Sequence, residues 1–261
     1  MKIDNSMFQA WHFCPLFFWE KYIQKIEPDT DRSYLALGIR VHQLLHEYYL
    51  PPAKPYPESE DATCETEAQL ILAKYIARYP VEPFEVIDAE RTIELKIPGT
   101  QHTYVFKADL LVRMLLTKRL FLVAHKTQKS TSRSNDPESW AARTQATLYL
   151  WAAGQHYGEV PEGMTVNVIT RGSEKGRVDP SFHRIDTIRR TPQQIELALR
   201  NLVYVAGEIE HAANEGFYPS DQNRCKEGWK KCDYFDLHII GRTDGNLRKF
   251  KPTTPYLEGM E

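Results

Sequence analysis

The chain has 261 residues, of which 42% are hydrophobic and 26% are charged, and its formal net charge is −2. This size suits one large domain, and the charge excludes an overall basic protein, so any nucleic-acid surface must be local. No hydrophobic run approaches the roughly 18 residues of a membrane span, and the N-terminus lacks a signal-peptide pattern. Four cysteines do not form a secreted disulfide framework. We therefore expect an intracellular protein with reduced or metal-bound thiols.

The N-terminal part of the sequence predicts helices. Two short helices are expected within residues 6–24, because Cys14-Pro15 interrupts an aromatic-rich segment that Ser6 can cap. Hydrophobic residues at helical spacing predict a helix over residues 34–50, on which Gly38 and His42 share a face. The acidic, proline-containing segment 51–66 predicts an exposed loop, and 66–79 predicts a further helix.

From residue 84 onwards the pattern favours strands. Residues 86–95 and 104–112 predict a β-hairpin with a turn at Pro98, Gly99 and Thr100. A buried strand follows at residues 120–124 and ends in His125 and Lys126. The remaining elements are a helix over 140–151, a strand over 164–170 and an amphipathic helix over 192–215 that Gly216 ends.

Several polar residues occupy positions where the pattern predicts hydrophobic ones. Asp109 interrupts a hydrophobic strand, where a carboxylate is costly unless it is paired or binds a metal. The hairpin, the next strand and the flanking helices could bring the whole set into one cleft. The set consists of His42, Glu90, Asp109, Lys126, Gln145 and Tyr149. Taken singly, each has an ordinary interpretation as a core or solvent-facing residue.

The order of these residues resembles the motifs of the PD-(D/E)XK nuclease superfamily, in particular its RecB-like branch of phage and bacterial exonucleases. The resemblance runs through Gly38-x-x-x-His42, Glu90, Lys107-Ala-Asp109, residues 124–127 and Gln145-x-x-x-Tyr149. It implies an α/β fold with a central mixed β-sheet flanked by helices, like a restriction-endonuclease core. The N- and C-terminal helical segments are expected to pack together. We expect one nuclease-like domain over residues 1–241 and a flexible tail over 242–261.

The resemblance also implies a metal-dependent phosphodiester hydrolysis. Asp109 would bind Mg²⁺ or Mn²⁺, with His42, the His125 carbonyl and, less firmly, Glu90 as further ligands. Lys126 would position or activate the attacking water and stabilise phosphate charge.

The remaining motif residues are expected to contact DNA. Gln145 and Tyr149 would hold the DNA backbone or orient Lys126. Three nearby basic residues could contact phosphates, namely Lys129, Arg133 and Arg143.

Ala124 departs from the pattern, because the superfamily has an Asp or Glu two residues before the motif lysine. Alanine cannot coordinate a metal, so we expect this chain to cleave DNA weakly or not at all. An alanine introduced deliberately and a natural loss of the acid both explain the sequence, and the retention of the other motif residues favours the first. The alternative function is a naturally non-catalytic DNA-binding or protein-interaction module on the same fold.

Members of this branch often hold an iron–sulfur cluster with one N-terminal and three C-terminal cysteines. Cys14, Cys225 and Cys232 match three of these positions, and His238 lies near the fourth. Such a set could hold a [4Fe–4S] cluster or Zn²⁺, or be buried thiols without metal.

The resemblance gives DNA as the partner, in phage or bacterial recombination, repair or defence. A helicase or recombination protein is a further candidate partner, and no membrane partner is expected. The expected location is the cytoplasm of a bacterial or phage-infected cell.

Overall fold

The computed structural model describes residues 1–30, 33–128, 137–172, 179–227 and 230–254. Its contacts divide the chain into two compact units. The terminal unit comprises Met1–Asp31, Glu94–Val105 and Leu199–Glu261, and the core unit comprises Arg32–Ile93 and Phe106–Ala198. In the described part of the chain, no helix is long and hydrophobic enough to cross a membrane.

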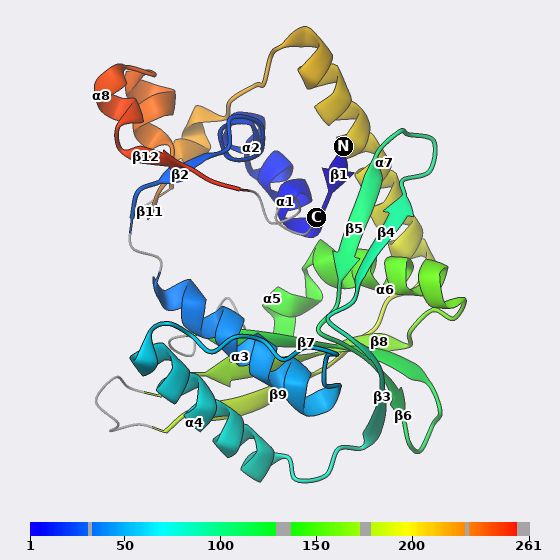
Figure 1. The fold of residues 1–261 in the computed structure, drawn as a ribbon. Coiled ribbons are helices and arrows are strands. Elements are labelled where there is room, and N and C mark those ends of the chain that lie inside the picture. The colour runs from blue at the N-terminus through cyan, green and yellow to red at the C-terminus, as the bar shows by residue number, and fades with distance from the viewer. Residues whose placement is uncertain (31–32, 129–136, 173–178, 228–229, 255–261) are drawn as a thin grey trace. The chain divides into compact units, whose positions relative to one another are not determined.

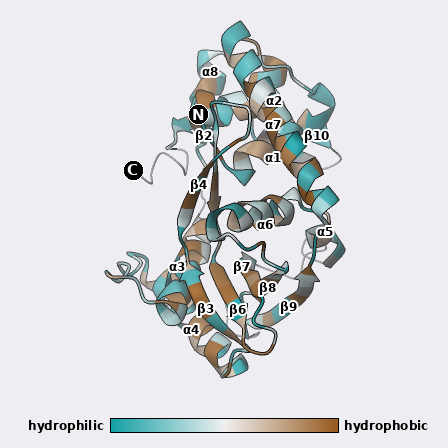
Figure 2. Ribbon diagram, turned by 90° about the vertical axis from the view of Figure 1, so that its right-hand side faces the viewer, coloured by the Kyte–Doolittle hydropathy of each residue, from teal (hydrophilic) through white to brown (hydrophobic). Residues whose placement is uncertain are grey.

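A five-stranded mixed sheet forms the centre of the core unit, with strand order β3-β6-β7-β8-β9 (Figure 1). The parallel pair is β7 with β8, and the other neighbours are antiparallel. Hydrophobic residues dominate β3 and β6 (Figure 2). The strands are β3 (Phe84–Ala89), β6 (Leu110–Met114), β7 (Leu120–Gln128), β8 (Gly163–Thr170) and β9 (Ser181–Ile188).

Helices α3 (Ser33–Tyr49) and α4 (Ala62–Arg78) lie side by side on one face of this sheet (Figure 1). Their hydrophobic residues form a buried cluster with Ile169 of β8. Helices α5 (Pro137–Ala141) and α6 (Thr144–Tyr157) follow β7 in the chain. Because side chains alternate along a strand, every second residue of β7 points away from α3.

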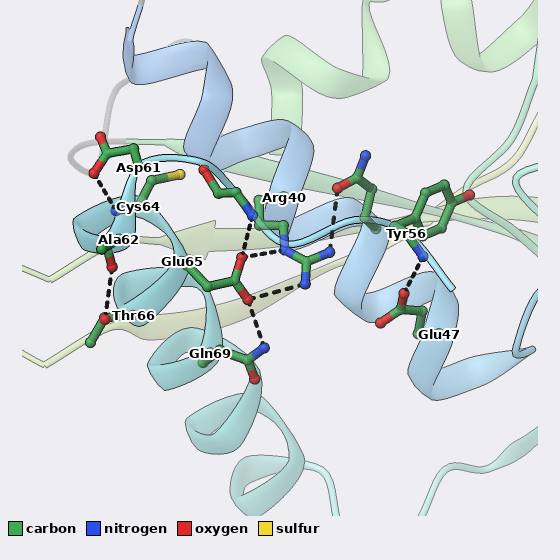
Figure 3. Close-up of polar contacts among 11 residues, drawn as sticks. Arg40, Glu47, Tyr56, Asp61, Ala62, Cys64, Glu65, Thr66 and Gln69 are labelled. Carbon is green, nitrogen blue, oxygen red and sulfur yellow. Dashed lines mark hydrogen bonds and ion pairs between the residues drawn. The ribbon is translucent and has the colours of Figure 1, made fainter. Parts of the chain in front are cut away.

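The salt bridge between Arg40 and Glu65 joins α3 to α4 (Figure 3). The guanidinium donates two hydrogen bonds to the carboxylate, at 2.6 and 3.0 Å. Glu65 also accepts from the Ser59 backbone and from Gln69, at 2.9 and 2.8 Å. These contacts lower the pKa of Glu65 to about 2, with the Arg40 hydrogen bonds as the largest cause. Asp61 caps the start of α4 by accepting from the Cys64 backbone.

The predicted hairpin is present, but its strands belong to two different sheets. Its first strand divides into β3 and β4 (Thr92–Lys96), and its second into β5 (Thr103–Lys107) and β6. In the terminal unit, β5 lies between β4 and β1 (Lys2–Ile3). The break falls at Glu90 and Asp109, where the Glu90 N–H donates to the Asp109 carbonyl at 3.0 Å. Both interrupting carboxylates therefore sit where the strands leave the core sheet.

The terminal unit brings the two ends of the sequence together, as expected. Strand β2 (Ile26–Pro28) pairs with β12 (Phe250–Pro252), and Glu20 forms an ion pair with Arg242. The first part of helix α7 (Pro192–Glu215) belongs to the core unit, and the rest belongs to the terminal unit. The other helices of the terminal unit are α1 (Asn5–Phe13), α2 (Pro15–Phe18), the π-helix η1 (Trp19–Ile23), the 3-10 helix η3 (Gln222–Cys225), the π-helix η4 (Asp236–Ile240) and α8 (Asp244–Leu247). Its other strands are β10 (Lys226–Glu227) and β11 (Lys230–Lys231).

Three local expectations differ from the structure. Within the segment expected to be a flexible tail, residues 244–252 form α8 and β12, because β2 supplies a strand partner and Lys249 pairs with Asp236 at 2.6 Å. The predicted loop 51–66 ends earlier, since α4 begins at Ala62 and buries Cys64. Strand β9 was not predicted at all.

Candidate active site

A cavity of about 170 Å³ opens in the core unit beside the end of β7. Its lining includes eight residues that the sequence singled out: His42, Asp109, Ala124, His125, Lys126, Arg143, Gln145 and Tyr149. The helix, the strands and the following helix therefore converge as expected. Glu90 lies at the same place through its contacts with two lining residues, His42 and Lys107. Lys129 and Arg133 lie outside the described residues.

Three of these residues form a group of possible metal ligands. Nδ1 of His42 lies 3.4 Å from Oδ1 of Asp109 and 3.8 Å from Oε1 of Glu90. One donor atom from each residue lies within 4.8 Å of the other two. Two carboxylates and an imidazole suit Mg²⁺ or Mn²⁺, so the donor set fits the divalent ion that the motifs imply.

The same proximity changes the protonation of these groups. Burial lowers the pKa of His42, but the carboxylates of Asp109 and Glu90 outweigh this effect and raise it to about 10. Burial raises the pKa of Asp109, yet the His42 charge and the His125 backbone N–H lower it to about 2. The pKa of His125 is lowered to about 4, chiefly by burial. Without a metal, the site at neutral pH therefore holds an ionised Asp109 beside a protonated His42, with His125 neutral, and a divalent ion would displace the His42 proton.

The Asp109 carboxylate replaces a backbone acceptor at the end of the β6–β7 pairing. The antiparallel pairing of β6 with β7 stops at Leu110 and Val123. Two residues beyond Val123 on β7, the His125 backbone N–H donates to Oδ2 of Asp109 at 2.5 Å. The carboxylate thus satisfies a strand N–H that β6 no longer reaches. This bond fixes Asp109 to the motif strand, with its other oxygen facing His42.

Glu90 is held by an unusual backbone. Its φ is +52°, in the left-handed region that non-glycine residues rarely adopt. Its carboxylate binds Nζ of Lys107 at 2.5 Å and is only 11% exposed. Strained residues of this kind cluster at functional sites. Lys107 was not predicted as a site residue, although it ends β5 only two positions before Asp109.

Alternation along β7 separates its motif residues. Ala124 and Lys126 face the cavity lining contributed by α5 and α6. The His125 side chain points to the other face, where its ring stacks on Tyr49 at 6.0 Å and is 5% exposed. The side chain at position 124 is therefore a wall of the cavity, next to Lys126.

A buried polar network supports His125 from behind. Asn167 lies 3.1 Å from Nδ1 of His125 and donates to the Tyr75 hydroxyl at 2.8 Å. Tyr75 also contacts the Tyr49 hydroxyl at 2.6 Å and accepts from Arg184 at 3.1 Å. Sequence patterns did not predict this network, and its one visible sign in the sequence is the polar Asn167 within a hydrophobic strand.

The α5 and α6 side of the cavity carries Gln145, Tyr149 and Arg143. The Tyr149 ring packs edge-on against Phe106 at 4.7 Å. The guanidinium of Arg143 lies over the Trp140 ring, 3.8 Å from its centroid. Trp140 is only 3% exposed, so it supports Arg143 and is not available to stack on a base. Both Trp140 and Arg143 line the cavity.

The cysteines of interest gather in the terminal unit. Sγ of Cys225 lies 3.6 Å from Nδ1 of His238, and the Cys232 backbone donates to the Cys225 carbonyl at 2.9 Å. Burial raises the pKa of the Cys232 thiol to about 11, and the thiols of Cys225 and Cys14 add to the shift. Nε2 of His238 is buried and has no hydrogen-bond partner among the residues that the structure describes.

The cysteine and histidine donors suit zinc or an iron–sulfur cluster in type, but they do not close around one ion. Tetrahedral zinc places thiolates about 3.8 Å apart. In the described ranges, the group of three donors within 4.8 Å of one another is the one at His42, Glu90 and Asp109. A mononuclear zinc site would therefore need the thiols to move closer together.

The chain resembles known proteins in sequence pattern and in fold. The sequence pattern of the PD-(D/E)XK nuclease superfamily matches residues 6–237. No curated protein matches the chain. A crystal structure of an exonuclease candidate from Eubacterium rectale is similar, with 15% identity, a TM-score of 0.53, and coverage of 92% of this chain and 94% of that one. The structure of SSO0001 has 12% identity and a TM-score of 0.41, with coverage of 93% and 87%. The family match spans most of the chain, and the fold has the expected mixed sheet flanked by helices, so this protein belongs to the PD-(D/E)XK nuclease superfamily.

Proposed function

We propose that this chain is a metal-dependent DNA exonuclease of the RecB-like branch whose present form is catalytically impaired at Ala124. One observation carries the proposal. His42, Glu90 and Asp109 offer ligand atoms within 4.8 Å of one another, at a cavity that Lys126 also lines. The name of the similar Eubacterium rectale protein supports an exonuclease over an endonuclease.

The residues have separate tasks in this proposal. A divalent ion held by Asp109, His42 and Glu90 would neutralise phosphate charge and lower the pKa of a bound water. Lys126 would stabilise the charge that develops on the phosphate oxygens and orient the attacking water. The His125 N–H keeps Asp109 fixed, and the His125 carbonyl is the proposed further ligand.

DNA would be held on the α5 and α6 side of the cavity. The Arg143 guanidinium, supported by Trp140, would contact a phosphate. Gln145 and Tyr149 would donate hydrogen bonds to the DNA backbone or to Lys126. We place the process in phage or bacterial recombination, repair or defence, where a helicase or recombination protein would be the partner.

The activity test is restoration of the missing acid. Ala124→Asp and Ala124→Glu are compared with the parent on 5′- and 3′-labelled single- and double-stranded DNA, with Mg²⁺, Mn²⁺ or EDTA. We expect the restored forms to cleave at least about 100-fold faster than the parent with metal, since a metal-site contact is worth several kcal/mol. His42→Ala in the restored background should reduce cleavage and weaken Mn²⁺ binding.

The outcome also separates the two candidate functions. If both restored forms remain inert on every substrate with either metal, the nuclease proposal is wrong. The second candidate, a non-catalytic DNA-binding or protein-interaction module, is favoured by Ala124 itself, and it predicts this inert result with retained binding. The label that is released first gives the polarity of an active exonuclease.

The cysteine group is a second part of the proposal. We propose that Cys14, Cys225, Cys232 and His238 hold a [4Fe–4S] cluster, or zinc if the thiols move closer together, and that this group ties the two ends of the chain together. The buried, partnerless Nε2 of His238 and its short distance to Cys225 support this assignment. Iron, sulfide and zinc are measured in protein purified without oxygen. Absence of all three would leave the group as buried thiols.

A further inference from the structure

The carboxylate of Glu90 already binds a cation that belongs to the protein. Its Oε2 lies 2.5 Å from Nζ of Lys107, whereas its Oε1 lies 3.8 Å from Nδ1 of His42. The ion pair is largely shielded from solvent, since the side chains of Glu90 and Lys107 are 11% and 29% exposed. Shielding strengthens the attraction between opposite charges, so this pair is stronger than an ordinary surface salt bridge.

The backbone brings the two partners together. Glu90 adopts a φ of +52°, and its N–H donates to the Asp109 carbonyl at 3.0 Å. Lys107 ends β5 two residues before Asp109. All three residues belong to the core unit. The Lys107 ammonium is therefore fixed beside the candidate metal ligands by the local path of two neighbouring strands.

The same carboxylate is part of the metal-ligand group. Glu90, His42 and Asp109 offer ligand atoms within 4.8 Å of one another. Lys107 thus binds a carboxylate that a divalent ion would also use. The two oxygens of one carboxylate are close neighbours, so an ammonium on Oε2 repels a divalent ion on Oε1 as well. The ion and the ammonium therefore compete for Glu90.

We propose that Lys107 is an internal counter-ion of Glu90, which competes with the divalent ion and weakens its binding. This inference rests on the proposed function, because it takes the metal site from it. A shielded carboxylate that loses its partner is strongly destabilising, so Lys107 stabilises the fold before the ion binds. Lys107 also lines the cavity of about 170 Å³, which gives its side chain room to leave Glu90 when the ion arrives.

The test is Mn²⁺ binding to the full chain, measured by the loss of the free-ion signal in electron paramagnetic resonance. It needs no cleavage, so the parent with Ala124 serves. Lys107→Met removes the charge. Lys107→Gln also removes it but keeps an N–H donor for Glu90, which protects the fold if the first variant does not fold. The control Lys74→Met removes a lysine of α4 that pairs with Asp179 at 3.2 Å.

We expect Lys107→Met to lower the Kd for Mn²⁺ about tenfold, and Lys107→Gln to lower it at least about threefold. Lys74→Met should stay within about twofold of the parent. In the Glu90→Gln background, Lys107→Met should change the Kd by less than about twofold, because no carboxylate then holds the ammonium at the site. This double-mutant cycle separates competition for Glu90 from a general repulsion between lysine and metal.

An unchanged or higher Kd for both Lys107 variants would overturn the inference, as would an equal gain from Lys107→Met with and without Glu90. Asp109→Asn distinguishes this failure from that of the proposed function, because it should weaken Mn²⁺ binding whatever Lys107 does. If Asp109→Asn weakens binding but the Lys107 variants do not strengthen it, only this inference is wrong. If Asp109→Asn has the Kd of the parent, the proposed metal site is wrong and the inference falls with it.

Discussion

The hydroxyl group of Tyr75 gives a sharp test of the network behind β7. Tyr75→Phe removes one oxygen that has three partners: the Tyr49 hydroxyl at 2.6 Å, Asn167 at 2.8 Å and Arg184 at 3.1 Å. Tyr75 is 1% exposed, so solvent does not replace the lost oxygen. The ring remains, and the cavity created is smaller than a water molecule.

The size of the effect follows from what each partner keeps. Arg184 retains two hydrogen bonds to Glu82, and Tyr49 retains one to the same carboxylate. Asn167 retains only its 3.1 Å contact with His125. One buried donor is thus left largely unsatisfied, which costs about 1–3 kcal/mol. We expect a loss of about 2 kcal/mol and a fall in Tm of roughly 4–8 °C.

The assay is thermal unfolding followed by circular dichroism, with Tyr79→Phe as the matched control. Tyr79 lies four residues further along the chain, and its hydroxyl makes no hydrogen bond within the described part of the structure. Its ring contact with Arg184, at 3.7 Å, survives the change to Phe. Tyr79→Phe should therefore shift Tm by less than about 2 °C. If Tyr75→Phe and Tyr79→Phe have the same Tm, the network does not stabilise the sheet.

Two further predictions concern packing and charge. Glu65→Gln should destabilise the protein by about 1–2 kcal/mol at pH 7, because Arg40 loses its partner in a partly solvated pair. The pKa of Glu65 is about 2 in the folded protein, below its ordinary value of 4.5. Its contribution to the free energy of unfolding is therefore fully present above about pH 4.5 and is lost as the pH falls towards 2. In acid unfolding, the stabilities of the parent and of Glu65→Gln should converge. Gly163→Ala should cost about 1–3 kcal/mol, since its Cβ would lie 2.9 Å from the Ile188 carbonyl oxygen. The control Gly207→Ala meets no atom within 4 Å on helix α7 and should be neutral or stabilising in the same thermal melts.

Sequence patterns predicted the elements of the core sheet better than their partners. The period of two identified the strands around Asp109 and the strand that ends at Lys126, because local alternation survives in any pairing. It did not reveal that the hairpin divides at Glu90, since the division depends on which sheet each half joins. Strand β12 was hidden for the same reason: three residues around Lys251 form a strand only because β2 is there to pair with them.

The candidate site was predicted as a set of residues, but its contacts were not. Motif order indicated that His42 and Asp109 would meet, and they lie 3.4 Å apart. Lys107 was missed because its sequence position marks it only as a strand residue, and its bond to Glu90 depends on the turn between β3 and β4. The support of His125 by Asn167 joins residues 42 positions apart, which no local pattern encodes.

The left-handed backbone at Glu90 lowers the stability of the fold but places a carboxylate in the candidate metal site. In this conformation a residue with a Cβ lowers the free energy of unfolding by about 1–2 kcal/mol relative to glycine. Selection for thermal tolerance alone would therefore favour glycine at position 90 and discard a carboxylate of the metal-ligand group. In a library of variants selected for heat resistance, Glu90→Gly should accumulate only when DNA processing is not required. The residue found at position 90 therefore shows whether selection acted on stability alone or also on DNA processing.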